Sequence, residues 1–244
     1  KRDKAILSVM SGAQREPDGA FLGIATDPAA TKTAIAYTLQ RLRVDYIDIY
    51  RPARVSPHVP IEDTVGAIAD LVKAGYVRHI GLSEAGADTI RRAHAVHPIV
   101  DLQIEYSTMS RSVERTILPT LRELGIGMTA YGVLSRGLLS GHWRPDRALD
   151  PGDFRGHVPR FQGDNLDANL RLVEALRGVA EELGGTVAQV AVAWVLSRGD
   201  DVVPLVGART RERLAESLGA PAVKLGPDDL ARIEAAVPAG AVAG

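Results

Sequence analysis

Short apolar runs alternate with segments of helical periodicity along almost the whole chain, and this alternation constrains the fold more than any other feature. Strands are predicted at residues 5–10, 46–50, 77–82, 101–105, 127–131 and 202–205. Helices are predicted at residues 28–43, 61–74, 87–97, 112–124, 167–183, 186–196 and 210–218, with a last helix from Pro227. Strands that alternate with helices in this way predict an α/β protein, with a parallel sheet and helices outside it.

Two segments lack this periodicity and contain many turn-forming residues. Residues 14–26 include Pro17-Asp18-Gly19 and are predicted to form a loop. Residues 141–165 form a longer insertion rich in Pro and Gly, and an insertion of this length is typical of a lid, a binding loop or a disordered segment. The rest of the chain is consistent with one α/β domain over residues 1–244.

The composition excludes several classes of function. The 244 residues carry a formal net charge of −1 and form no basic stripe, which argues against nucleic acid or an anionic membrane as a partner. No Cys is present, so disulfides and thiolate metal sites are excluded. No apolar run reaches the length of about 18 residues that a membrane span needs, and the cytoplasm is the expected location.

A buried strand at residues 46–50 ends in an irregular loop that contains Arg51, Pro52, Ala53 and Arg54. In parallel α/β proteins the chemistry is usually placed at this end of the strands. None of the four loop residues is an ordinary general acid or base at neutral pH. The sequence therefore places a candidate site at this loop without supplying an obvious proton-transfer group.

Several sequence blocks occur in the order found in one enzyme family. They are residues 41–50, 54–55, 59–64, 71–84, 102–107, 130–137 and 203–209. On these blocks the chain resembles the aldo-keto reductase superfamily, a (β/α)8-barrel group whose bacterial members use NADPH. The resemblance implies a barrel fold, NADPH as the cofactor and a small-molecule carbonyl substrate.

The same resemblance shows where this chain departs from the family. Relatives place a Lys where this chain has Met10 and a His where it has Ala53, while the family Tyr and Asp lie N-terminal to Lys1. Arg51, His142 and His157 are the remaining candidates for the chemistry. Arg51 can clamp a carboxylate or an enolate-like oxygen, and the two histidines flank the candidate lid. The histidine spacing predicts no metal site.

The segment that follows the last predicted strand grips the adenosine 2′-phosphate of NADPH in the family. Backbone N–H groups at a helix start and Arg side chains both suit a phosphate group. The alternative is a solvated, Arg-rich helix face, and Ser217 replaces the Asn usual in the family. The candidate residues are Gly207, Arg209, Arg213, Glu216 and Ser217.

Other strand ends match the family residues that hold the nicotinamide ring. Ser83, Glu84 and Gln103 match the positions that bind its carboxamide, and Tyr131 matches the aromatic ring that stacks on its face. These side chains could instead satisfy loop backbone groups. The block at residues 130–137 adds two further candidates, Leu134 and Arg136, and has Gly132-Val133 where the family commonly has Ser-Pro.

Six predicted strands are fewer than the eight of a closed barrel, so this chain is expected to lack the first two βα units. The resulting gap would be flanked by apolar edge strands at residues 5–10 and 202–205, which are prone to pairing. Either residues precede Lys1 or another chain covers the gap. A homodimer is predicted if Lys1 is close to the true start of the protein.

Three hypotheses for the function follow from these observations. The first is a divergent NADPH-binding oxidoreductase that acts on a small carbonyl compound. The second is a non-redox enzyme on the same scaffold, such as an isomerase, a cyclase or a dehydratase. The third is an NADPH-sensing or interaction protein without turnover. The substitutions at Met10 and Ala53 favour the second and third hypotheses, whereas the breadth of the family resemblance favours the first, which is the expected function.

Overall fold

The computed structural model describes residues 2–144 and 149–244. The chain separates into two compact units, one formed by Lys1–Ile104 with Arg115–Met128 and the other by Glu105–Glu114 with Thr129–Gly244. Part of the predicted loop at residues 141–165, namely residues 145–148, lies outside the described residues.

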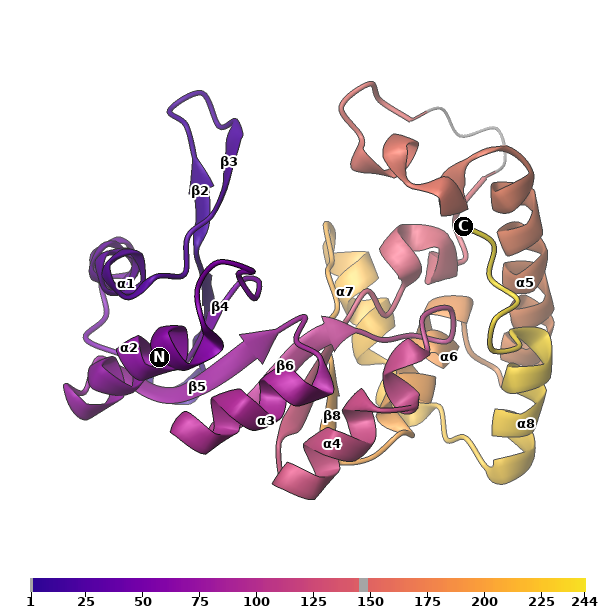
Figure 1. Cartoon of the computed structure of the whole chain (residues 1–244). Coiled ribbons are helices and arrows are strands. Elements are labelled where there is room, and N and C mark those ends of the chain that lie inside the picture. The colour runs from indigo at the N-terminus through magenta and orange to yellow at the C-terminus, as the bar shows by residue number, and fades with distance from the viewer. Residues whose placement is uncertain (1, 145–148) are drawn as a thin grey trace. The chain divides into compact units, whose positions relative to one another are not determined.

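The first unit contains parallel strands in the order β1, β4, β5 and β6. Helices α1 to α3 alternate with these strands, as the sequence predicts, and α4 follows β6 (Figure 1). The strands are β1 (Ser8–Ser11), β4 (Ile47–Pro52), β5 (Val77–Ser83) and β6 (Ile99–Glu105). The helices are α1 (Pro28–Leu42), α2 (Ile61–Lys73), α3 (Ala87–Val96) and α4 (Ile117–Leu124), and short 3-10 turns form at Arg2–Lys4 and Ser112–Glu114.

Helix α1 begins and ends where its sequence signals indicate. The side chain of Asp27 accepts a hydrogen bond from Ala30 N at 3.0 Å, and Pro28 occupies the first turn. Arg43 closes the helix in the left-handed conformation, with φ of 55°. The helix therefore leads directly into β4, whose C-terminal end carries Arg51.

Strand β1 lies at an edge of the sheet, as the sequence predicts. It begins three residues later than predicted, and the preceding Ile6 is 76% exposed. Met10 within the strand is 40% exposed. An apolar edge strand of this kind is prone to pair with another strand.

Residues 14–26 are not the simple loop that was predicted. Strands β2 (Ala13–Arg15) and β3 (Phe21–Ile24) form an antiparallel hairpin, which projects from the rest of the first unit in Figure 1. The turn was correctly placed, because Ala20 N donates to Asp18 Oδ1 at 2.8 Å. The strands were missed because their mostly exposed residues show no alternation of apolar and polar side chains.

The second unit contains most of β7 (Gly127–Tyr131), β8 (Val202–Pro204) and four helices. Leu205 N donates to Ala130 O at 2.8 Å, which joins the segment after β8 to β7. Helices α5 (Gly163–Glu182), α6 (Val187–Leu196), α7 (Arg211–Leu218) and α8 (Pro227–Ala236) follow the predicted order, although α5 begins four residues earlier than predicted. Short 3-10 turns form at Ser135–Ser140, Phe154–His157, Pro159–Phe161 and Ala220–Ala222.

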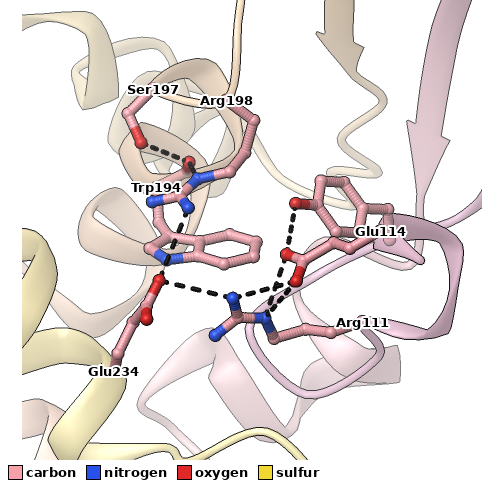
Figure 2. Close-up of polar contacts among 7 residues, drawn as sticks. Arg111, Glu114, Trp194, Ser197, Arg198 and Glu234 are labelled. Carbon is pink, nitrogen blue, oxygen red and sulfur yellow. Dashed lines mark hydrogen bonds and ion pairs between the residues drawn. The ribbon is translucent and has the colours of Figure 1, made fainter. Parts of the chain in front are cut away.

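A polar network around the buried ring of Trp194 joins α6, α8 and the segment after β6 (Figure 2). Arg111 pairs with Glu114 at 2.9 Å and with Glu234 at 3.3 Å. Arg198 pairs with Glu234 at 3.5 Å, and its guanidinium carbon lies 4.3 Å from the centre of the Trp194 ring. The network ties helices of the second unit together away from the residues that line its main cavity.

Among residues 2–144 and 149–244, no single helix is long and apolar enough to cross a membrane. Helices α5 and α6, which meet at a bend of 84°, are together long and apolar enough for a membrane span by length and composition alone.

Candidate functional site

A cavity of about 740 Å³ lies within the second unit. Its walls come from the end of β7 with the turn that follows, and from the segment after β8 with α7. All of the candidate residues that the sequence places in this unit for cofactor binding line the cavity. They are Tyr131, Leu134, Arg136, Gly207, Arg209, Arg213, Glu216 and Ser217.

The turn after β7 wraps tightly along one wall of the cavity. Gly132 has φ of 69° and Gly137 has φ of 108°, while Ser135 and Arg136 adopt the left-handed region with φ of 45° and 54°. Left-handed backbone is uncommon for residues other than Gly and is often found at functional sites. This turn brings Leu134 and Arg136 to the same wall as Tyr131.

Helix α7 supplies another part of the cavity wall. Thr210 caps the helix, because its side chain accepts a hydrogen bond from Arg213 N at 3.3 Å. Arg209 precedes this cap and Arg213 follows it, so both exposed cations line the cavity at the helix start. A helix N-terminus and two Arg side chains together favour an anionic group such as a phosphate.

His142 contacts two residues of α7 but does not itself line this cavity. Its Nε2 contacts a guanidinium nitrogen of Arg213 and lies 3.7 Å from Glu216 Oε1. Arg213 also donates to Glu216 Oε2 at 3.0 Å. Burial alone would raise the pKa of Glu216, but the hydrogen bond from Arg213 and the nearby positive charges lower it. Glu216 therefore stays ionised and holds Arg213 in place.

The candidate residues of the first unit meet at the ends of β5 and β6. Ser83 lies opposite Gln103 in the strand register, and Glu84 N donates to Gln103 O at 3.0 Å. Glu84 has φ of 52°, which is unusual for a residue with a side chain. Ser83 is 1% exposed, and its Oγ has no hydrogen-bond partner in the described part of the chain. A buried hydroxyl without a partner is a candidate contact for a polar ligand.

Arg51 is buried rather than open to a substrate, with 1% of its surface exposed. Its guanidinium donates to Gln103 Oε1 and to Ser8 Oγ, each at 2.6 Å, and pairs with Asp101 at 2.5 Å. Burial lowers the pKa of Arg51, and Asp101 opposes this shift. The side chain thus joins residues of three strands within the first unit.

Comparison with known proteins decides the family. A sequence model described as "Aldo/keto reductase family" matches residues 27–238. The protein is an aldo/keto reductase family member. The resemblance carried by the sequence blocks is thereby confirmed, and so is the α/β fold class with the family's barrel topology.

Individual relatives agree with this assignment. A Glycine max protein named "Probable aldo-keto reductase 1" is 46% identical over 217 residues, which are 89% of this chain and 62% of that protein. The solved glycerol dehydrogenase from Gluconobacter oxydans is 26% identical, with a TM-score of 0.89 over 97% of this chain and 73% of its own. A thermostable aldo-keto reductase, solved with the inhibitor epalrestat, is 25% identical with a TM-score of 0.70 over 86% of this chain and 67% of its own.

The chain spans 62% of the length of its curated relative. Members of the family generally use NAD(P)H and bind small-molecule substrates.

The two positions that the resemblance assigns to the family Lys and His lie on neighbouring strands of this aldo/keto reductase. Met10 is in register with Arg51 on β4, and Ala53 directly follows β4. Ala53 N donates to Ser11 O at 2.7 Å, so the ends of the two strands are joined by their backbones. Ala53 is 8% exposed and Met10 is 40% exposed. Neither side chain can transfer a proton.

His142 contacts Arg213 and Glu216, which line the main cavity, and no such contact is found for the other histidine candidate among the described residues. His157 ends the 3-10 turn Phe154–His157, is exposed and lies outside the residues that line the main cavity. In residues 2–144 and 149–244, no group of three or more His, Asp or Glu side chains is placed to hold a metal ion.

Sequence reasoning missed several residues that line the main cavity. Thr210 could have been found from its position as a capping residue before the Arg-rich helix. Ser140, Ala188 and Val206 carry no comparable signal, because ordinary small or apolar residues contribute only by their place in the fold.

Proposed function

We propose that this protein binds NADP(H) and acts as an oxidoreductase on a small carbonyl compound or the corresponding alcohol. The observation that carries the proposal is the cavity of about 740 Å³ in the second unit. Every cofactor-binding candidate of that unit lines it, although these residues come from two segments separated by some seventy positions in the sequence, from Arg136 to Gly207. The glycerol dehydrogenase among the solved relatives supports a small polyol or its carbonyl product as the type of substrate.

The cations at the start of α7 favour NADP(H) over NAD(H). Arg209 and Arg213 are exposed at the cavity wall, and Glu216 holds Arg213 by a hydrogen bond of 3.0 Å. A guanidinium can donate two parallel hydrogen bonds to a phosphate group. We assign these two residues to the adenosine 2′-phosphate, which NAD(H) lacks.

The ends of β5 and β6 fit a carboxamide group. The buried Oγ of Ser83 lacks a partner among the described residues, and Gln103 is its partner in the strand register. A hydroxyl and an amide side by side can satisfy both the oxygen and the nitrogen of a carboxamide. We assign Ser83 and Gln103 to the nicotinamide carboxamide, with Glu84 N–H used by the backbone of Gln103.

Bound NADPH would supply a hydride to the carbonyl carbon of a substrate. The residues of this chain would orient the cofactor, but Met10 and Ala53 offer neither a proton nor a positive charge to the carbonyl oxygen. Loss of positioned acid–base catalysis typically lowers a rate by about 10²- to 10⁴-fold. We therefore propose that a group other than these two side chains supplies the proton, with His142 and His157 as the candidates from this chain.

The same substitutions favour a second candidate function. A protein that binds NADP(H) without reducing carbonyl compounds, either as a sensor or as a non-redox isomerase, cyclase or dehydratase, has no need of the Lys and His. Met10 lies partly exposed on an edge strand and Ala53 is buried. Neither side chain carries a titratable group that could replace the Lys or the His.

Titration of the purified protein with NADPH and NADH, by calorimetry or by fluorescence, tests the assignment. Arg209→Ala and Arg213→Ala are each expected to weaken NADPH binding about tenfold or more and to leave NADH binding unchanged. Arg211→Ala is the matched control, since Arg211 lies on the same helix but outside the cavity lining. Equal affinity for both nucleotides, or binding of neither, would remove the phosphate assignment.

A further inference from the structure

The side chain of Arg51 crosses a neighbouring strand to reach its partners. Arg51 lies on β4, whereas Asp101 and Gln103 lie on β6, with β5 between these two strands. The residue of β5 at the crossing is Gly81, which is in register with Asp101. A Cβ at Gly81 would lie 3.2 Å from Arg51 Nε, so the absence of a side chain leaves the space that the guanidinium occupies.

The partners of Arg51 lie on one face of the sheet. Asp101 and Gln103 are two residues apart on β6, so their side chains point to the same side. Asp101 pairs with the guanidinium at 2.5 Å, and Ser8 Oγ accepts a hydrogen bond from it at 2.6 Å. The guanidinium is therefore held from both sides and cannot readily turn toward another group.

This fixed guanidinium determines which end of the Gln103 amide remains for a ligand. Arg51 can only donate hydrogen bonds, so it accepts no contact from an amide nitrogen. The bond of 2.6 Å from Arg51 to Gln103 Oε1 uses the amide oxygen and leaves Nε2 as the group that can bind elsewhere. Without Arg51, the Gln103 amide could rotate by a half-turn and present either end.

We propose that Arg51 is a positioning residue that fixes the Gln103 amide, so that Nε2 donates to the carboxamide oxygen of the nicotinamide ring. The proposal rests on the proposed function, because the ligand is NADP(H). The carboxamide nitrogen would then donate to Ser83 Oγ, which is buried without a partner among the described residues. Arg51 sets specificity through Gln103 and does not itself touch the ligand.

The test compares three ligands: NADP⁺, the fragment 2′,5′-ADP, which lacks the nicotinamide, and the nicotinic acid analogue of NADP⁺. The analogue carries a carboxylate, which can accept a hydrogen bond from Nε2 but is repelled by an amide oxygen or a second carboxylate. The wild-type protein is expected to bind this analogue at least as tightly as NADP⁺. The ratio of the NADP⁺ and 2′,5′-ADP affinities reports the contribution of the nicotinamide half alone.

Two variants separate positioning from folding. Arg51→Met is combined with Asp101→Asn, because removing Arg51 alone would leave a buried carboxylate without its partner. Gln103→Glu keeps Arg51 and its ion pair, and replaces the amide donor by a second acceptor for the guanidinium. Thermal unfolding of each variant shows whether the fold is retained.

Both variants are expected to lower the ratio of NADP⁺ to 2′,5′-ADP affinity by about three- to tenfold, the effect of one or two hydrogen bonds, while 2′,5′-ADP binds as before. Gln103→Glu should also reject the nicotinic acid analogue, whereas the Arg51→Met/Asp101→Asn variant should still bind it, because a freely rotating Gln103 amide can turn Nε2 toward the carboxylate. Unchanged ratios in folded variants would overturn the role of Arg51 and leave the proposed function intact. Binding of neither NADP⁺ nor 2′,5′-ADP to the wild-type protein would overturn the proposed function and this inference together.

Discussion

Gly81 leaves room for the side chain of Arg51: a Cβ at Gly81 would lie 3.2 Å from Arg51 Nε and 3.0 Å from Ile49 Cγ2. Gly81→Ala is therefore expected to lower the free energy of unfolding by about 1–3 kcal/mol, the usual cost of overpacking a well-packed interior. Denaturant unfolding monitored by circular dichroism measures this change.

Gly66→Ala is the matched control for this substitution. Gly66 lies inside α2, and a Cβ there would meet nothing within 4 Å. Because Ala is the better helix former, the control is expected to stabilise the protein by about 0.5–1 kcal/mol. If Gly81→Ala stabilised the protein by a similar amount, this would contradict the placement of the Arg51 side chain over Gly81 of β5.

Asp48 holds the chain segment that precedes β1 onto β4. Its Oδ2 accepts hydrogen bonds from Leu7 N at 2.9 Å and from Arg2 at 2.7 Å. Burial by itself would raise the pKa of Asp48, but these hydrogen bonds and the charges of Arg2 and Arg78 lower it. A carboxyl group whose pKa is lower in the folded state stabilises the fold above its unfolded pKa of about 3.9. This stabilisation is lost as the pH falls through the folded pKa.

Asp48→Asn is accordingly expected to lower the free energy of unfolding by about 1.5–3 kcal/mol at neutral pH, the value of hydrogen bonds to a charged group. The difference from the wild-type protein should shrink as the pH falls below about 4. Thermal unfolding of both proteins between neutral and acidic pH measures this dependence, with the exposed Asp45→Asn as control. A difference that stays constant across this range would show that the charge of Asp48 contributes nothing.

The sequence predicts the repeating βα units well and the site residues unevenly, for physical reasons. Buried strands such as β4 can be predicted from their local apolar composition, and capped helices such as α1 from capping residues such as Asp27. The role of Arg51 could not be predicted in this way, because its partners lie far along the sequence: Gln103 is 52 positions after Arg51. A contact across an intervening strand depends on register, which local periodicity does not specify.

Gly132 stands where the resemblance places a Ser, and its backbone conformation suits Gly. Gly132 has φ of 69°, and a Cβ there would lie 3.1 Å from Glu105 Cγ. Gly132→Ser is expected to lower the free energy of unfolding by about 1–2 kcal/mol, because a residue with a side chain is strained in this conformation. Gly152→Ala serves as the control, since Gly152 is exposed and a Cβ there would meet nothing within 4 Å. Chemical denaturation of the two variants gives the comparison, and equal stability of Gly132→Ser and the wild-type protein would contradict the strain at this turn.

The proposed assignment of Met10 and Ala53 to the family Lys and His positions predicts weak carbonyl reduction. NADPH-dependent reduction of simple aldehydes, followed by the loss of NADPH absorbance, is expected to be about 10²- to 10⁴-fold slower than for a relative with the Lys and His, since acid–base catalysis is lost. NADPH binding, which depends on other residues, serves as the control that the site is formed. Aldehyde reduction by the unmodified protein at the rate of an ordinary family member would show that Met10 and Ala53 do not occupy the Lys and His positions.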